Sequence, residues 1–351
     1  MNYQPLCSII INNYNYDRFL AEAIDSALNQ TYPHTEVIVV DDGSTDNSRQ
    51  IIARYENRII PILQPNGKQA AAFNSGFVKS KGDIIIFLDS DDYLFPQAVI
   101  KIVAVWKPEL AKVHYRLNVV DGVGVSLGYS CPQGSSPLSS GRVLQTLLEK
   151  GGYVSTPTSG NALNRQVLSK LFPIPDEYKL TADDYLSFQV PFYGEIAAIE
   201  EPLGVYRVHD NNQWALATVT GDRFKRFVRH DLQNFALLSH KAQEFGYQVP
   251  WDLEQRAIGR LWSRIISLRL NGDTHPVNSD RSIKLIYQGI RSLWKYSDFN
   301  TLKRLAYSIW FFWVGLMPLW LAKPAISWLY APHQRPKFIE QGVRKFRQWA
   351  S

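Results

Sequence analysis

Aspartate side chains follow two apolar runs of the chain, at the points where each run ends. Asp41 and Asp42 come directly after VIVV, and Asp89, Asp91 and Asp92 come after IIIFL. Several carboxylates that meet at one place repel one another unless a cation lies between them. Mg²⁺ and Mn²⁺ prefer oxygen ligands and commonly combine one or two carboxylates with substrate phosphates. The spacing therefore predicts a divalent-metal and phosphate-ester site; the alternative is that these aspartates only form turns and helix caps.

The runs around these acids predict the elements that hold them. Strands are expected at 7–12, 35–44, 58–64 and 83–94, and helices at 16–30, 45–56 and 68–82. This alternation predicts an α/β protein with a mostly parallel sheet and helices on both faces. In such sheets ligands bind outside the carboxyl ends of the strands, where the acids lie. Residues 121–141 are rich in Gly, Ser and Pro and are expected to form a loop or mobile lid.

Composition restricts the class of protein and of partner. The chain has 351 residues, 45% of them hydrophobic, which predicts a globular protein with a large core. Its two cysteines, Cys7 and Cys131, suggest no disulfide framework, which fits a reducing compartment. No basic segment precedes the first apolar run, so no cleaved secretory signal is expected. The net charge of +6 comes without a nucleic-acid-binding motif, so lipid and phosphate partners are favoured over nucleic acid.

Two common nucleotide-binding motifs are missing. The first predicted strand, CSIIINNYNY, is not followed by GxGxxG, which argues against a dinucleotide enzyme. The sequence also lacks GxxxxGK[ST], which argues against a P-loop ATPase.

An apolar segment at 305–322 has no charged residue, and Lys303, Arg304 and Lys323 flank it. The segment is about long enough to cross a hydrocarbon core of ~30 Å. Pro318 and the surrounding tryptophans favour an interfacial or re-entrant segment instead. A buried core helix is the alternative, and the basic flanks favour contact with a membrane.

Two long stretches resemble glycosyltransferase family 2, a group of inverting enzymes with the GT-A fold. They are SIIINNYNYDRFLAEAIDSALNQTYPHTEVIVVDDGSTDNS and QPNGKQAAAFNSGFVKSKGDIIIFLDSDD. TADDYLSF resembles the family's Glu-Asp acceptor-side motif, and PLGVYRVHDNN resembles its Tyr-Arg-x-His ending, so the likeness covers about residues 6–212. The resemblance implies a Rossmann-like GT-A domain, which is expected at 1–220. After Asn212 the pattern is mainly helical, which predicts a helical C-terminal region at 221–351 that contains the apolar segment 305–322.

The resemblance implies positions for the donor's nucleotide. Asn12 and Tyr14 would border the nucleobase, with Tyr14 packing on it. Asp42 would accept a hydrogen bond from the ring N–H of the base. Lys68 would lie beside the base or the diphosphate.

It also implies a metal site. Asp89 and Asp91 match the Asp-x-Asp motif: Asp89 would contact the ribose or a metal-bound water, and Asp91 would bind Mn²⁺ or Mg²⁺ directly. Asp92 is adjacent and has no separate role. Arg207 could reach the diphosphate or instead brace a carboxylate, and His209 could contact the metal or a phosphate.

On the acceptor side, Asp184 matches the acid of the Glu-Asp motif and is expected to be the catalytic base. Asp183 replaces the family's Glu, so Asp183 remains an alternative base. The base takes the proton of the acceptor hydroxyl as that oxygen attacks the anomeric carbon. Without the resemblance, both acids would be read as a helix N-terminus.

Together these features predict a metal-dependent inverting glycosyltransferase. The donor is expected to be a nucleotide diphosphate sugar, uridine-linked by preference, and the acceptor a hydroxyl on a glycan or lipid-linked glycan. The protein is expected in the cytoplasm, at the inner face of the cell membrane. The alternatives are a nucleotidyltransferase and an inactive nucleotide-sugar-binding scaffold.

Overall fold

The computed structural model describes residues 4–133, 136–209, 212 and 220–330. Contacts divide the chain into two units, one of Met1–Gln145 with Tyr153–His209 and one of Thr146–Gly152 with Asp210–Ser351. Each unit has its own apolar core. The predicted boundary near residue 220 stays a prediction, and residues 331–351 of the predicted helical region lie outside the described residues.

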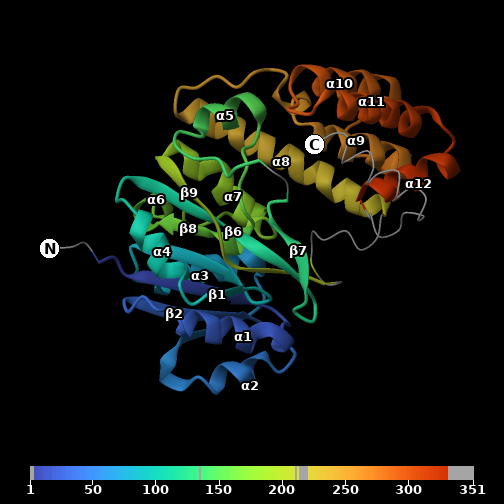
Figure 1. Cartoon of the computed structure of the whole chain (residues 1–351). Helices are drawn as coiled ribbons and strands as arrows, with labels where there is room; N and C mark the ends of the chain where they lie inside the picture. Colours follow the sequence, from blue (N-terminus) through green and yellow to red (C-terminus); the bar gives the residue numbers. More distant parts are fainter. Residues whose placement is uncertain (1–3, 134–135, 210–211, 213–219, 331–351) are drawn as a thin grey trace. The chain divides into compact units, whose positions relative to one another are not determined.

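The first unit is built on one mixed sheet (Figure 1). Its strands, in sheet order, are β3 (Ile60–Gln64), β2 (Thr35–Asp42), β1 (Cys7–Asn13), β4 (Ile84–Asp89), β8 (Asn161–Asn164), β6 (Leu110–Asp121), β9 (Glu195–Val208) and β5 (Tyr93–Leu94), with β7 (Ser126–Cys131) paired to β6. Strands β3, β2, β1 and β4 are parallel, as are β6 and β9. The sheet is therefore mostly parallel, as the sequence predicts.

Helices cover both faces of this sheet, and the alternation of side chains along β1 shows how. Ile9 and Ile11 join the core beneath one set of helices. Ile10 points the other way, where Gly76 of α3 lies so close that a Cβ would collide with it. Successive strand residues point to opposite faces, which is why Ile9, Ile10 and Ile11 are all apolar. The helices are α1 (Asp17–Leu28), α2 (Ser48–Ala53), α3 (Lys68–Lys79), α4 (Ala98–Val105), α6 (Arg165–Leu168) and α7 (Ala182–Gln189).

The parallel register brings polar strand ends together. Asn12 on β1 lies opposite Asp89 on β4, and Asn13 lies opposite Asp41 on β2. The carboxyl ends of β1, β2 and β4 thus meet at one edge of the sheet, as the sequence predicts.

The predicted loop or lid at 121–141 is wrong at Asp121 and at Ser126–Cys131, which lie in strands. Asp121 ends β6, the chain turns, and β7 returns antiparallel beside β6. Residues 122–125, 132–133 and 136–140 form neither helix nor strand. Gly124 and Gly128 have φ of +89° and +76°, a backbone conformation that glycine adopts without strain. Leu127, Tyr129 and Cys131 do alternate along β7, but the Gly, Ser and Pro content of the range favoured a loop.

The second unit is helical, as expected after Asn212. Its helices are α5 (Leu144–Lys150, which begins in the first unit), α8 (Gly221–Glu244), α9 (Ile258–Asn271), α10 (Ser282–Lys295), α11 (Thr301–Leu316) and α12 (Leu319–Tyr330). The apolar segment 305–322 is not one helix, because α11 ends at Leu316 and α12 begins after Pro318. Among the described residues, no helix combines the length and the apolar character needed to cross a bilayer.

Candidate functional site

The acid cluster lies where β4 ends. Asp89 is the last residue of β4, and the chain turns at once, with the N–H of Asp92 donating to the Asp89 carbonyl (3.0 Å). Asn12 donates from Nδ2 to Oδ1 of Asp89 (2.8 Å). Burial, and then the negative charge of Asp91, raise the pKa of Asp89 to about 7. The surroundings therefore disfavour a full negative charge on Asp89.

Asp92, for which sequence analysis predicts no separate role, is a bracing residue. It is buried; its Oδ2 accepts from Ser159 Oγ (2.6 Å) and its Oδ1 from the backbone N–H of Arg207 (2.9 Å). Burial, and then the charges of Asp91 and Asp89, raise the pKa of Asp92 well above its usual range. Asp92 thus ties the turn after β4 to β9 and to the short 3₁₀ turn Thr158–Gly160.

Asp91 and His209 form a pair. Nε2 of His209 lies 3.1 Å from Oδ2 of Asp91. The imidazole stacks on Phe19 (centroids 5.2 Å apart) and meets the edge of Tyr16 (5.5 Å). The turn between β6 and β7 also lies against it, since a Cβ on Gly122 would be 3.3 Å from Cβ of His209. The ring is therefore held in place before any ligand arrives.

This pair suits a divalent cation whose other ligands come from a substrate. The described residues contain no group of three or more Asp, Glu, His or Cys arranged to hold a metal. A carboxylate and an imidazole are nevertheless suitable ligands for Mn²⁺, which in substrate sites often takes its other ligands from phosphates and water.

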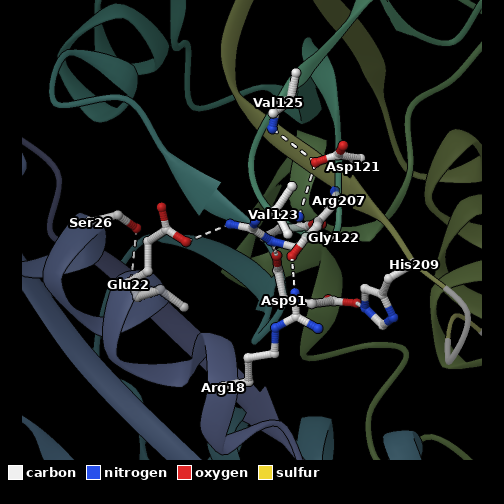
Figure 2. A network of polar contacts seen from close by, with 12 residues as sticks. Arg18, Glu22, Ser26, Asp91, Asp121, Gly122, Val123, Val125, Arg207 and His209 are labelled. Atoms are coloured by element: carbon white, nitrogen blue, oxygen red, sulfur yellow. Dashed lines mark hydrogen bonds and ion pairs between the residues drawn. The ribbon is translucent and has the colours of Figure 1, made fainter.

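The side chain of Arg207 reaches toward Glu22 and the backbone of Asp91 (Figure 2). Its side chain is buried: Nε donates to the Asp91 carbonyl (2.9 Å), and Nη2 donates to the carboxylate of Glu22. The guanidinium lies 4.7 Å from the ring centroid of Phe19, the ring that stacks on His209. These contacts match the bracing role that the sequence left open for Arg207. Beside it, Arg18 donates to the Gly122 carbonyl and so fixes the β6–β7 turn.

The predicted nucleotide side lies along β1, β2 and α3. Tyr14 is 43% exposed, and Nζ of Lys68 lies 5.5 Å from its ring centroid. Asp42 is buried and accepts from the backbone N–H groups of Gly67 (2.9 Å) and Lys68 (2.7 Å) and from Gln64 Nε2 (2.7 Å). Lys68 has a φ of +69°, so the turn into α3 is held in an uncommon conformation by Asp42.

The predicted acceptor acids lie in the first turn of α7. Oδ2 of Asp183 accepts from Thr158 Oγ1 (3.2 Å), and Oγ of the next residue, Ser159, accepts from the backbone N–H of Asp89 (3.1 Å). The 3₁₀ turn Thr158–Gly160 therefore links the acid pair of α7 to the acid cluster of β4. Asp183 and Asp184 both line a cavity of about 130 Å³ beneath α7.

Lys112 lines the same cavity and is 1% exposed. Its Nζ donates to Tyr153 Oη (3.0 Å) and Ser155 Oγ (2.9 Å), and among the described residues it has no carboxylate partner. Burial lowers the pKa of Lys112 to about 7. An ammonium group in this position destabilises the folded chain.

Substituting Lys112 with Met is expected to remove a pH dependence of stability. An unfolded lysine keeps its proton until about pH 10, so between pH 7 and 10 the unfolded chain binds more protons than the folded one. The free energy of unfolding should therefore rise with pH across this window in the unsubstituted protein, by a few kcal/mol, and fall again as pH returns to 7. Urea unfolding at pH 7, 8, 9 and 10 measures this slope. Lys101→Met, at a partly exposed lysine, is the control; equal slopes in all three proteins would contradict the prediction.

Sequence analysis missed several residues that build the site. Glu22, Phe19, Thr158 and Ser159 carry no signal of their own, because their partners lie far away in sequence. Lys112 does carry one: a single lysine stands in the otherwise apolar start of a strand.

Comparisons with known proteins point to one family. The model of "Glycosyl transferase family 2" matches residues 8–170. An uncharacterized glycosyltransferase of Nostoc sp. is 38% identical over 224 residues, which cover 62% of this chain and 69% of that protein.

Two solved structures share the fold. S. aureus TarS 1–349, in complex with UDP-GlcNAc, aligns with a TM-score of 0.50 at 15% identity, over 92% of this chain and 91% of that chain. The mannosyltransferase PcManGT from Pyrobaculum calidifontis, in complex with GDP-Man and Mn²⁺, aligns with a TM-score of 0.50 at 17% identity, over 95% and 83% of the two chains.

The predicted GT-A fold with a helical C-terminal region is confirmed by these likenesses and by the sheet itself. The match to the Nostoc protein carries the family assignment, because 38% identity extends over 224 residues and 69% of that protein. The chain is a glycosyltransferase and belongs to glycosyltransferase family 2.

Proposed function

We propose that this chain transfers a sugar from a nucleotide diphosphate sugar to a hydroxyl acceptor, with inversion at the anomeric carbon and with a divalent metal. The observation that carries the proposal is the bridge at Thr158 and Ser159. Thr158 donates to the carboxylate of Asp183 and Ser159 accepts from the backbone of Asp89, so a candidate base lies beside a candidate diphosphate site. Family membership favours sugar transfer over nucleotidyl transfer.

Asp91 and His209 would hold the metal, with Asp89 on a metal-bound water or the ribose. When bound, Mn²⁺ or Mg²⁺ supplies positive charge that stabilises the departing diphosphate. The Mn²⁺ in the mannosyltransferase structure supports the use of a divalent metal in this fold. Arg207 supports the pair from behind, because its guanidinium holds the backbone of Asp91.

Replacing Glu22 with Gln is expected to raise the Mn²⁺ concentration for half-maximal activity by about tenfold. Gln carries no negative charge to pair with Arg207. The hydrogen bond from Arg207 to the Asp91 carbonyl therefore weakens, while the metal ligands are unchanged. Activity at saturating Mn²⁺ should change by no more than about twofold, because Glu22 touches no reacting atom. Glu201→Gln is a matched control: its side chain is 57% exposed against 53% for Glu22, and it pairs with Lys101. The same Mn²⁺ dependence in both variants would contradict the bracing role.

The nucleotide would lie against β1, β2 and α3. The exposed ring of Tyr14 offers a face for a base, and Asp42 remains a candidate acceptor for the base's ring N–H. Lys68 is close enough to Tyr14 to approach a base or phosphate bound there. A uridine-linked donor is the proposed choice.

Asp184 is the proposed base, with Asp183 as the alternative. As the acceptor oxygen forms its bond to the anomeric carbon, the bond to the diphosphate breaks and the diphosphate leaves with the electron pair. The carboxylate takes the hydroxyl proton in the same step. Attack opposite the leaving group inverts the configuration.

The acceptor is proposed to be a glycan or lipid-linked glycan at the inner face of the cell membrane, reached from the cytoplasm. Two observations support this location. Cys7 and Cys131 are both free, which fits a reducing compartment. The described helices of the second unit also leave large apolar side chains exposed, as argued below.

A donor screen tests the proposal. Purified protein is incubated with Mn²⁺, UDP-, GDP- and dTDP-sugars, and a lipid extract, and products are read by mass spectrometry and NMR. We expect transfer from one donor class, most strongly a UDP-sugar, with the opposite anomeric configuration in the product. A retained configuration would overturn the single displacement, and nucleotide monophosphate bound to the acceptor would reveal nucleotidyl transfer.

A further inference from the structure

Helix α11 has two apolar faces, only one of which is covered by the described residues. Phe311, Val314 and Gly315 are buried, and Gly315 lies so close to α10 and α9 that a Cβ would meet Ile286 at 2.6 Å. The opposite face, here called the outer face, repeats every three or four residues along the helix. Its members are 41–66% exposed: Leu302, Leu305, Ile309, Phe312, Trp313 and Leu316.

Neighbouring helices extend this outer face. Trp294 of α10 is 44% exposed, and its indole N–H donates to Ser308 (3.3 Å), which places it beside the middle of α11. Trp320 of α12 is 72% exposed. Trp313 donates its indole N–H to the Leu321 carbonyl (3.0 Å), so its ring can lie in an apolar phase with its polar atom satisfied. A group of large exposed apolar side chains like this one marks an interaction site on a folded unit.

The charged residues in the segment that carries this face are mainly positive. Residues 281–330 contain seven Lys and Arg but one acid, Asp298, whereas residues 221–280 contain nine Lys and Arg and seven acids. Lys284, Lys295 and Lys323 are exposed. Apolar and aromatic side chains bordered by basic ones are typical of helices that lie in the interface of an anionic bilayer.

The size and packing of α11 decide how it would meet a membrane. Sixteen helical residues span about 24 Å, less than a hydrocarbon core of ~30 Å. The inner face is also occupied by α9 and α10, so the helix cannot be surrounded by lipid. Contact is possible only along its length, with the outer face toward the acyl chains.

We propose that the outer face of α11, with Trp294 and Trp320, docks in the plane of an anionic lipid surface. This inference deepens the membrane part of the proposed function and does not depend on its sugar-transfer part. The apolar side chains enter the interface, and the surrounding lysines contact the lipid headgroups.

Vesicle sedimentation of the full chain tests the proposal. Vesicles of phosphatidylcholine alone are compared with vesicles that also contain phosphatidylglycerol, at low and high salt. We expect binding to the anionic vesicles that salt weakens. The double substitution Ile309→Glu with Phe312→Glu should lower the partition coefficient at least about tenfold. Lys284→Gln should lower it on the order of fivefold.

Matched controls separate the surface from general effects. Val78→Glu with Ile100→Glu places two acids at exposed apolar positions of the first unit, and binding should not change. Asp91→Asn should bind vesicles like the unsubstituted protein, so loss of the metal role and loss of the membrane role are distinguished. The proposal is overturned if the full chain ignores both vesicles. It is equally overturned if the Ile309/Phe312 variant binds normally, or if that variant instead abolishes a dimer of the chain.

Discussion

Replacing Asp184 with Asn is expected to lower the turnover number for sugar transfer by about 10³-fold, with donor binding changed by no more than about threefold. Asn has the same size but cannot accept the proton of the acceptor hydroxyl. The substitution lies in the first turn of α7, whereas the proposed donor contacts lie on β1, β2, α3 and the end of β4. Transfer rates at saturating substrates measure the first effect, and calorimetric titration of the donor with metal measures the second.

Two further variants make this test specific. Asp183→Asn lies one residue earlier; its amide oxygen can still accept from Thr158, but it has no carboxylate to take a proton. If it shows the larger loss of turnover, Asp183 is the base. Asp176→Asn, at an acid with a side chain 86% exposed in the 3₁₀ turn before α7, is the control and should leave turnover unchanged. If Asp184→Asn chiefly abolishes donor binding, Asp184 is a donor contact instead.

Asp91→Asn is expected to lower kcat/KM by about 10³-fold or more and to remove its response to Mn²⁺. The amide lacks the charge that a divalent cation requires, and several kcal/mol of stabilisation of the leaving diphosphate go with it. Initial rates across a Mn²⁺ titration measure both effects. His209→Ala should act in the same direction, because Nε2 of His209 lies 3.1 Å from Oδ2 of Asp91.

The matched control lies at the other end of the same strand. Asp83 is an exposed acid just before β4, whereas Asp91 lies just after it. Asp83→Asn should keep the Mn²⁺ response of the unsubstituted enzyme. A strong Mn²⁺ response that persists in Asp91→Asn would remove this residue from the metal site.

The sheet and the place of the acid cluster could be predicted because the signals for them are local. The runs at β1, β2 and β4 are apolar on both faces, which is how strands buried between helices read. Parallel pairing then fixes where their carboxyl ends meet, and Asn12 and Asp89 are indeed opposite each other. The roles of these residues toward a donor stay predictions.

The bracing contacts could not be predicted, because they join residues far apart in the chain. Glu22 and Arg207 are 185 positions apart, and neither residue alone marks the pair. The strand β7 was mistaken for part of a loop or lid because the Gly, Ser and Pro content of 121–141 outweighed the alternation of Leu127, Tyr129 and Cys131. The break at Met317–Pro318 was signalled by the proline, yet only the packing of α11 on α9 and α10 shows which face stays exposed.

The central claim is that the acids at the end of β4 hold a divalent metal against the donor's diphosphate, and calorimetric titration of UDP tests it most directly. The unsubstituted protein and Asp91→Asn are each titrated with and without Mn²⁺, with GDP as a second nucleotide. We expect Mn²⁺ to tighten binding of the preferred nucleotide to the unsubstituted protein by about 100-fold or more, and to leave Asp91→Asn unaffected. Equal affinity with and without Mn²⁺, or the same gain in both proteins, would contradict the claim.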